Sequence, residues 1–249
     1  MVSEASTPDA VSGGTPAKKR RRSGSKSPRV RMPRDTLNRA VIVEAGIAIA
    51  QRDGLEGLTF QALGNELGAH ATAVYRHFRD KDEFLLEVID TLRDRSYGDT
   101  LVSTGDWRED LRAIATSIRQ HYLRYAPFAQ EMSVRSTHRK AEFGNVEFAL
   151  DALHRAGLSS EDAVLYMRLF GNYVRAMSSF EAAVTCLDPE LRAKDRVQMQ
   201  VGSLALEPEQ FPNLVQAASS LLAFDDPRVF DVGLEAILDA IQAHAVREG

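Results

Sequence analysis

The chain has 249 residues, of which 44% are hydrophobic and 27% are charged, with one cysteine and a formal net charge of -4. This is enough apolar sequence to bury a sizeable core, arranged as one small and one larger domain. No apolar run is long enough to cross a membrane, the first residues lack the apolar core of a signal peptide, and Cys186 alone can form no internal disulfide. We therefore expect a cytoplasmic protein without a membrane partner.

The first 34 residues are poor in apolar side chains and carry nine lysines and arginines against two acidic residues, whereas the rest of the chain is acidic. Such a segment cannot repay the entropy cost of ordering, so residues 1–34 are expected to form a disordered basic arm. The arm can add non-specific affinity for DNA phosphates and a minor-groove contact through Arg29, Arg31 or Arg34. Two alternatives stay open: a solvated tail without a specific role, and a nuclear-localisation signal at residues 18–22.

The next part of the chain predicts a helix-turn-helix. Residues 37–52 place apolar side chains at intervals of four, which predicts an amphipathic helix. Thr59 can cap a short helix over residues 60–67, and Gly68 can adopt the left-handed conformation that ends it. A second short helix is expected over about residues 71–78, with a polar, aromatic and basic outer face. The inward-facing positions are Leu37, Val41, Ala45, Ile49, Phe60, Leu63, Leu67, Val74 and Phe78.

A fourth helix, from residue 82 to about residue 95, is expected to lead away from this three-helix core, because residues 84–92 carry a wide apolar face. The ordered set of motifs over residues 35–92 resembles the DNA-binding domain of the tetracycline-repressor (TetR) family. The motifs that carry the resemblance are IVEAGIAIAQRDG at 42–54, Leu58-Thr59, Leu67-Gly68, VYRHF at 74–78 and DKDEFL at 80–85.

The resemblance implies a set of DNA contacts. Thr59, Tyr75 and Lys81 match positions that hold the DNA backbone, through a hydroxyl, a phenol and an ammonium group. The positions that match those facing the major groove are Gln61, His70, Ala71, Thr72, Ala73 and Arg76. Glutamine can pair with adenine, arginine with guanine or a phosphate, and alanine or threonine can touch a thymine methyl group. Phe78 is expected in the core, and His77 is expected to be structural rather than a base contact.

After the DNA-binding region the pattern stays helical, without strand alternation. Ser159 begins a pattern typical of a capping box, which opens the longest helix; its apolar residues cover nearly every side, so it should pack against several neighbours. Asp226 followed by Pro227 predicts the start of the last helix. Residues 188–226 give the weakest pattern, with a short helix expected at 213–223. The other helices are expected over residues 107–125, 127–135, 140–156, 159–187 and 228–244.

The resemblance also implies a partner and a ligand. In the TetR family the last two long helices of each subunit form a four-helix dimer interface, which places residues 160–184 and 228–244 between two copies of the chain. Residues 93–249 would form a ligand-binding and dimerisation domain that holds an effector among its middle helices. The candidate lining residues are Trp107, His121, Tyr125, Phe128, Met132, Phe143, Met167, Phe170, Tyr173 and Met177. Because aromatic and methionine side chains also fill ordinary helical cores, three or four of these are expected to touch a ligand, and His121 is expected in the core.

No pattern indicates catalysis. The six histidines show no metal-binding spacing with one another or with the cysteine, and neither a glycine-rich phosphate loop nor a Gly-x-Ser-x-Gly elbow is present. An aromatic and methionine-rich cavity favours a flat or hydrophobic small molecule over a sugar or a phosphate. The chain is therefore expected to be a non-enzymatic protein without a metal or a cofactor.

The sequence predicts an all-α, homodimeric, ligand-responsive regulator of transcription, a repressor released from double-stranded operator DNA by a hydrophobic or aromatic effector. Two recognition helices would enter successive major grooves of a palindrome about 34 Å apart. The helix over residues 82–95 joins the two domains and is the expected lever. Two alternatives are a ligand-independent protein that binds DNA broadly through its basic arm, and a ligand-binding or enzymatic dimer whose helix-turn-helix no longer reads DNA.

Overall fold

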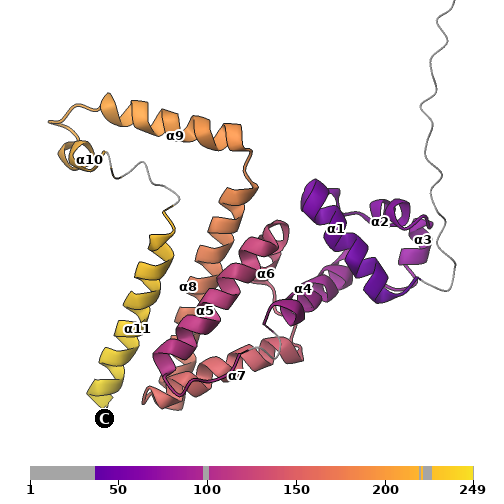
Figure 1. Cartoon of the computed structure of the whole chain (residues 1–249), viewed down its shortest axis with the longest axis horizontal. Helices are drawn as coiled ribbons and strands as arrows, with labels where there is room; N and C mark the ends of the chain where they lie inside the picture. The colour runs from indigo at the N-terminus through magenta and orange to yellow at the C-terminus, as the bar shows by residue number, and fades with distance from the viewer. Residues whose placement is uncertain (1–36, 98–100, 219, 221–225, 249) are drawn as a thin grey trace, which may run out of the picture. The chain divides into compact units, whose positions relative to one another are not determined.

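The computed structural model describes residues 37–97, 101–218, 220 and 226–248, which belong to a single unit of the chain, and the predicted basic arm at residues 1–34 lies outside them. The described residues form helices joined by turns, without a β-strand, so the predicted all-α fold is confirmed (Figure 1). None of these helices is both long and apolar enough to cross a membrane. In chain order they are α1 (Arg39–Gly57), α2 (Phe60–Glu66), α3 (Ala71–Val74), α4 (Lys81–Tyr97), α5 (Trp107–Arg124), the 3-10 helix η1 (Ala126–Phe128), α6 (Ala129–Val134), α7 (Lys140–Arg155), α8 (Ser160–Cys186), α9 (Pro189–Leu204), α10 (Pro212–Ala217) and α11 (Arg228–Glu248).

Helices α1 to α4 enclose an aromatic core. Phe60 at the start of α2 and Phe78 after α3 both meet the ring of Phe84 on α4 edge to face, with ring centroids 6.1 and 5.1 Å away. Helix α1 can approach this ring because residue 46 is a glycine: a β-carbon there would lie 2.3 Å from Cζ of Phe84. The same core continues into η1 and α6, where Phe128 and Ala129 are buried. The core therefore does not separate at residue 92, and the predicted boundary between a DNA-binding domain and a ligand-binding domain at that residue stays a prediction.

Helix α1 differs from its predicted bounds at both ends. It begins after Asn38, whose side chain accepts a hydrogen bond from the Val41 amide, so Leu37 lies outside the helix. The sequence predicts an end near Arg52, but helical bonding continues to Gly57 across a kink at Gly54, where φ is 74°. An apolar repeat marks only the buried face of a helix, so it carries little information about how far the exposed last turns continue.

The α-helical part of α3 is shorter than predicted. The sequence predicts a helix over residues 71–78, but only Ala71–Val74 is α-helical. Beyond it, the amides of Arg76 and His77 bond to carbonyl groups three residues earlier, which is the tighter 3-10 pattern. The inward positions keep their places nonetheless: Val74 and Phe78 are fully buried, as predicted.

Helix α8 is the central helix of the remaining part of the chain. It contacts α5, α6, α7 and α11, which agrees with its prediction as a helix buried by more than one neighbour. Its inward side chains Phe170 and Val174 belong to an apolar core shared with α5, α7 and α11. The opposite face is not covered within the single chain, since Leu165 is 62% and Leu169 is 48% exposed.

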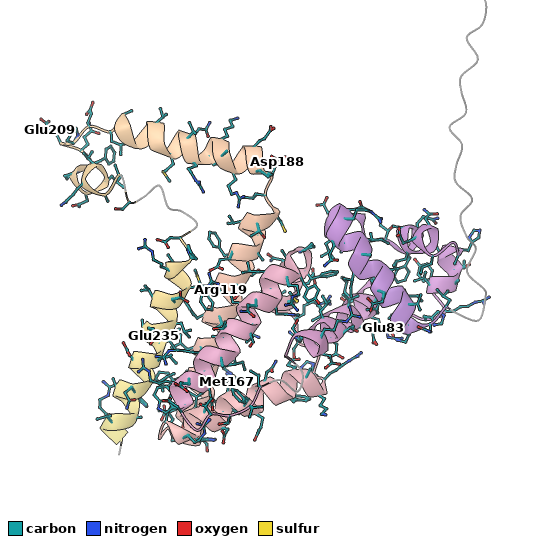
Figure 2. The ribbon with its side chains drawn as sticks, viewed as in Figure 1. Glu83, Arg119, Met167, Asp188, Glu209 and Glu235 are labelled. Atoms are coloured by element: carbon teal, nitrogen blue, oxygen red, sulfur yellow. The ribbon has the colours of Figure 1, made fainter. Side chains whose placement is uncertain are left out.

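Polar contacts tie α5, α8 and α11 together (Figure 2). The guanidinium of Arg119 on α5 lies 2.7 Å from the carboxylate of Glu181 on α8 and stacks over the ring of Phe230 on α11, 4.6 Å from its centroid. The hydroxyl of Tyr173 on α8 lies 2.9 Å from the Phe230 carbonyl oxygen and donates to the first turn of α11. On the next turns of α11, Glu235 pairs with Arg112 of α5 at 2.5 Å. These contacts hold α11 against α5 and α8.

Helix α9 was missing from the sequence prediction. It begins at Pro189, and the side chain of Asp188 caps it by accepting hydrogen bonds from the amides of Glu190 and Leu191. An aspartate followed by proline is the same signal that predicted the start of α11, so the information was present in the sequence. Helix α10 overlaps the helix predicted at residues 213–223, whose last residues lie outside the described part. Figure 1 shows α9 and α10 standing out from the ends of α8 and α11.

Candidate DNA-binding surface and ligand pocket

The turn between α2 and α3 brings the two helices into close contact. The hydroxyl oxygen of Thr59 accepts a hydrogen bond from the Ala62 amide at 3.0 Å and caps α2, while its own O–H stays able to donate. Gly68 has a φ of 62°, the left-handed conformation predicted for it. At Gly64 the turn passes so close that a β-carbon would lie 2.9 Å from the backbone nitrogen of Ala71. Glycine at these two positions therefore permits the tight helix-turn-helix.

The side chains predicted to contact DNA lie on the outer surface of this unit. Most of the residues predicted to contact bases or phosphates, Thr59 among them, are exposed, whereas Ala71 and Ala73 are half-buried. Tyr75 is 59% exposed, yet its ring packs edge to face against Phe60, with ring centroids 4.7 Å apart and planes at 72°. The contact with Phe60 therefore orients the Tyr75 ring while the side chain stays accessible. The exposed residues of the predicted set are Thr59, Gln61, His70, Thr72, Tyr75, Arg76 and Lys81.

The five basic side chains of residues 35–82 fall into two groups. Three are bound to carboxylates: Arg39 to Glu83 and Glu87, Arg52 to Asp53 and Glu66, and Arg79 to Asp80. Arg76 and Lys81, in contrast, have no carboxylate partner among the residues that the structure describes. Since both are exposed beside α3, their charges are available to an incoming phosphate or base. Arg39 instead has a structural part: it donates to the His77 carbonyl at 2.6 Å and stacks over Phe78.

A pocket of about 250 Å³ lies between α4, α5, α7 and α8. Its apolar wall includes Ile114 and Ile118 of α5 and Met167 of α8, a residue marked in Figure 2. Its polar wall includes the buried guanidinium of Arg93 on α4 and the carboxylate of Glu142 on α7, which lie 3.5 Å apart. The other lining residues are Tyr122, Asn145, Val146, Ala149, Arg168, Phe170, Gly171 and Arg175. An apolar pocket with a few converging polar groups is the usual form of a small-molecule site.

Two protein-family models match the chain. The model of bacterial regulatory proteins of the tetR family matches residues 42–88, and the model of the tetracyclin repressor-like C-terminal domain matches residues 101–245. The second match alone spans more than half of the chain. The chain belongs to the TetR family. It is therefore a helix-turn-helix, DNA-binding regulator of transcription, and the family recognised from the residues around α2 and α3 is confirmed.

Several repressors are similar to this TetR-family chain over most of their length. The HTH-type transcriptional repressor Rv1353c of Mycobacterium tuberculosis is 28% identical over 218 residues, which are 85% of this chain and 82% of the relative. The HTH-type transcriptional repressor DrrR1 of Streptomyces coeruleorubidus is 24% identical over 216 residues, which are 85% of this chain and 80% of the relative. The class D tetracycline repressor protein of Escherichia coli is 26% identical over 204 residues, or 81% and 88%.

Solved structures of the TetR family share the fold. The Streptomyces coelicolor TetR family protein ActR in complex with (S)-DNPA is 26% identical, with a TM-score of 0.70 over 84% of this chain and 98% of that chain. ActR in complex with actinorhodin has a TM-score of 0.75 at 24% identity, over 86% and 99%.

The pocket includes Met167 and Phe170 from the predicted ligand-binding set, and the other eight predicted side chains do not line it. Tyr125, Phe128 and Met132 belong to the core shared with α1 to α4. Trp107, Tyr173 and Met177 pack against the second core, and Phe143 is exposed. A ligand contact for these residues stays a prediction. The pocket residues that the sequence prediction missed are Arg93, Ile114, Ile118, Tyr122, Glu142, Asn145, Val146, Ala149, Arg168, Gly171 and Arg175.

His121, also in the predicted ligand set, is buried beside this region rather than in the pocket wall. Its Nδ1 lies 2.7 Å from the hydroxyl of Ser96 near the end of α4. Burial, together with the nearby charges of Arg93 and Arg124, lowers the pKa of His121 to about 3. The imidazole is therefore neutral at physiological pH and contributes a polar contact between α4 and α5.

A series of hydrogen bonds and ion pairs runs from the pocket to the segment just after the recognition helix α3. Arg93 donates to the hydroxyl of Thr137 and to the carbonyl of Arg135, at 3.2 and 3.3 Å, and so holds the loop before α7. At the end of that loop, Arg139 lies 3.0 Å from the carboxylate of Glu87 on α4. Glu87 in turn lies 3.0 Å from Arg39. Burial opposes ionisation of Glu87, but its bonds to these two arginines lower its pKa below the ordinary value.

Proposed function

We propose that this TetR-family protein is a repressor that binds a palindromic operator as a homodimer and is released when a small molecule occupies the pocket between α4, α5, α7 and α8. One observation carries the proposal. The pocket and the segment after the recognition helix are held by the same helix, because α4 supplies Arg93 to the pocket wall and Glu87 to an ion pair with Arg39, which bonds the His77 carbonyl just beyond α3. A ligand that alters the position of α4 therefore alters the support of the DNA-reading surface.

The proposed DNA contact uses the exposed side chains around α3. Tyr75, Lys81 and the O–H of Thr59 would bind phosphates, which is supported by the exposure of all three side chains. Arg76 and Gln61 are the long polar side chains that can reach base edges. Because α3 offers mainly small residues at its start, a large part of the affinity is assigned to phosphate contacts, including those of the basic arm.

The proposed dimer uses the exposed faces of α8 and α11. Leu165 and Leu169 on α8 are exposed in the single chain, and so are Val229 and Val232 on α11, at 53% and 68%. These two helices pack against each other within the chain. Burying their outer apolar faces against the same faces of a second copy would give an isologous interface and place two α3 helices on a symmetric operator.

The proposed effector site is supported by structure and by similarity. The pocket has an apolar wall and a few converging polar groups. ActR, which shares the fold at 26% identity, has been solved with (S)-DNPA bound and with actinorhodin bound. We therefore assign a small organic molecule, rather than a metal or a nucleotide, as the effector of this chain.

The proposed switch acts through α4. A ligand in contact with Arg93 and Glu142 competes with the bonds that these groups make to the loop at residues 135–139. Movement of that loop acts on Arg139 and, through Glu87, on Arg39, which holds the carbonyl of His77. A ligand that binds the DNA-free arrangement more tightly than the DNA-bound arrangement would release the operator. The expected difference in binding free energy is about 1–3 kcal/mol, which is typical of coupling between two sites.

The operator part of the proposal is tested by selecting bound duplexes from a random DNA pool. The purified full-length protein and a variant without residues 1–34 are compared. We expect the same palindrome from both, with lower affinity and a weaker salt dependence without the arm. Enrichment of no sequence by either protein would overturn the operator assignment and favour broad, ligand-independent DNA binding.

The switch is tested with aromatic compounds that raise the melting temperature of the protein and lower its affinity for the selected operator. A compound that saturates the pocket and leaves operator affinity unchanged would contradict release by the effector. Glu87→Gln is expected to keep compound binding but to reduce the operator response by about fivefold, because it breaks the link between Arg139 and Arg39. The matched control is Glu44→Gln, which removes another ion pair between α1 and α4, with Arg95, but leaves this link intact.

A further inference from the structure

The pocket carries more positive than negative charge. Three of its lining residues are arginines: Arg93 from α4, and Arg168 and Arg175 from α8. The only carboxylate in its described lining is that of Glu142, and Asn145 adds a neutral amide. Helix α5 adds the apolar side chains Ile114 and Ile118 to the lining. A molecule in the pocket would therefore meet both cationic groups and hydrocarbon.

The single carboxylate is already occupied by the loop before α7. Glu142 accepts hydrogen bonds from the Ser136 hydroxyl at 2.7 Å and from the backbone amides of Thr137 and His138 at 2.7 and 2.8 Å. Burial opposes its ionisation, but the Ser136 and His138 bonds and the charge of Arg93 keep the pKa of Glu142 below its ordinary value. Glu142 is thus an ionised group whose oxygens are used within the protein, and its distance of 3.5 Å from Arg93 is longer than a strong charge-assisted hydrogen bond.

Arg175 of α8 is bonded to neutral groups. Arg175 donates to the carbonyl of Gly171 at 3.1 Å and to the side-chain amide oxygen of Asn172 at 2.8 Å. Among the described residues, neither Arg168 nor Arg175 is paired with a carboxylate. Arg93 is buried, Arg175 is half-buried and Arg168 is exposed, so the three guanidinium groups extend from the inside of the pocket to its outer side. Of the three, Arg175 is the one that loses part of its hydration and is bonded only to neutral acceptors, while Arg93 keeps the 3.5 Å ion pair with Glu142.

We propose that the effector is an anionic amphipathic compound, with an apolar body against Ile114, Ile118 and Met167 and a carboxylate or similar anionic group bound by Arg175 and Arg93. This inference rests on the proposed function and names the chemical class of its ligand. An anion would gain charge-assisted bonds to Arg175, whose acceptors are neutral, and to Arg93, whose hydrogen bonds go to neutral groups and whose ion pair with Glu142 is 3.5 Å long. A cation would meet three like charges, and a neutral hydrocarbon would further dehydrate them without compensation.

The test uses two fluorescent probes of almost identical shape. 8-Anilinonaphthalene-1-sulfonate is anionic, and N-phenyl-1-naphthylamine has the same ring system without the sulfonate. Titration of the full-length protein with each probe gives two dissociation constants. We expect the anionic probe to bind one site per chain and more tightly than the neutral probe. Gly171→Phe identifies the pocket contribution: a β-carbon at Gly171 meets no atom within 4 Å, so the ring can enter the pocket without strain on the backbone and should displace both probes.

Variants of Arg175 then separate charge from shape. Arg175→Gln is expected to weaken the sulfonate probe by about tenfold and to leave the neutral probe unchanged, because one charged hydrogen-bond donor is lost. Arg175→Lys, which keeps the charge, should restore most of the affinity. Arg192→Gln on α9 is the matched control, since it removes an arginine outside the pocket lining and should change neither constant.

The outcomes distinguish the ligand class from the wider proposal. Equal affinity of the two probes in the pocket, or an Arg175→Gln variant that binds both as before, would overturn the anionic assignment and leave a ligand pocket of neutral preference. Binding of either probe that Gly171→Phe does not reduce would show that the pocket is not the site. In that case the proposed effector site itself would fail, and the anionic assignment with it.

Discussion

At the scale of single residues, the distinction between paired and unpaired basic side chains separates structure from DNA binding. Arg79 and Lys81 are two residues apart, yet Arg79 is bound to Asp80 at 2.9 Å, whereas Lys81 has no carboxylate partner among the described residues. A charge already neutralised by a neighbour contributes less to phosphate binding than a free one. The surface of α3 therefore cannot be judged from a count of basic residues.

The phosphate contacts can be removed without disturbing the fold. Tyr75→Phe combined with Lys81→Ala keeps the ring that packs on Phe60 and removes one hydroxyl and one ammonium group. We expect operator affinity to fall by about a hundredfold, and the salt slope to fall as well, because phosphate contacts are lost in both subunits. Fluorescence anisotropy with the selected duplex at several salt concentrations measures both. Arg79→Ala is the matched control and should cost only a few-fold; an unchanged affinity of the double variant would remove the phosphate assignment.

Asp110 gives a prediction about pH. This fully buried carboxylate at the start of α5 accepts bonds from the Ser103 hydroxyl and the Thr104 amide and pairs with Arg155 of α7 at 2.6 Å. Burial favours its neutral form, but these bonds outweigh burial and lower its pKa to about 2. Because the pKa is lower in the folded state, the stabilisation is complete above the unfolded-state value of about 4 and is lost as the pH falls from there towards 2.

Asp110→Asn should therefore lower the free energy of unfolding at pH 7 by about 2 kcal/mol, since the charge-assisted bonds from Ser103, Thr104 and Arg155 are weakened or lost. The variant should also lose less additional stability than the natural chain between pH 4 and pH 2. Urea unfolding at fixed temperature over this range measures both effects. Glu109→Gln is the control, because Glu109 precedes Asp110 on α5 but its side chain is exposed. Equal pH dependence of the natural chain and the Asn variant would show that another carboxylate controls acid unfolding.

At the scale of helices and turns, the helix-turn-helix was predictable because its signals are local. The cap at Thr59, the left-handed Gly68 and the buried Val74 each depend on a few neighbouring residues. The end of α3 was not predictable in the same way, because the carbonyl of His77 is bonded by Arg39, which lies 38 residues earlier. A periodic pattern contains no record of such a distant donor.

The pocket illustrates the same limit. Met167 was predicted to bind a ligand because hydrophobic side chains at helical spacing indicate an interior. Arg93 and Arg175 were not predicted, since a charged residue within a helix is typical of a solvated face. Only the packing of α4 against α5 and α7 brings Arg93 into the wall. Four helices together form this site, so its polar residues could not be recognised one helix at a time.

Gly64→Ala tests the turn that joins α2 to α3. The added β-carbon would lie 2.9 Å from the nitrogen of Ala71 and 3.0 Å from the carbonyl oxygen of Ala69, and backbone atoms cannot move aside as a flexible side chain can. We expect a loss of about 1–3 kcal/mol in the free energy of unfolding, with weaker operator binding, because α3 is displaced. Gly144→Ala on α7 is the control: no atom lies within 4 Å, so it should be neutral or slightly stabilising. Thermal unfolding of both variants that shows equal stability would contradict this account of the turn.

At the scale of the whole molecule, the DNA-reading surface and the pocket depend on one assembly. Two operator half-sites one helical turn apart require two α3 helices held at a fixed distance. A single chain supplies one. The outer faces of α8 and α11 carry apolar side chains that a monomer would leave in water, and exposed apolar surface can mark an interaction site. The proposed symmetric operator binding therefore requires the proposed interface.

Leu169→Glu tests this interface directly. Leu169 on α8 is 48% exposed in the single chain, so a charge there should be tolerated by the fold but not by a tightly packed α8 against α8 contact. Sedimentation velocity should show a dimer for the natural chain and a monomer for the variant. Operator affinity should fall at least about a hundredfold, because a monomer has only one helix-turn-helix to bind the operator. Leu191→Glu is the matched control: Leu191 on α9 is 46% exposed and lies outside the proposed interface, so this variant should stay dimeric. If Leu169→Glu stays dimeric while Leu191→Glu dissociates, the interface lies on α9 rather than on α8. In that case α9 of the second subunit would also have to be included in the account of the ligand pocket.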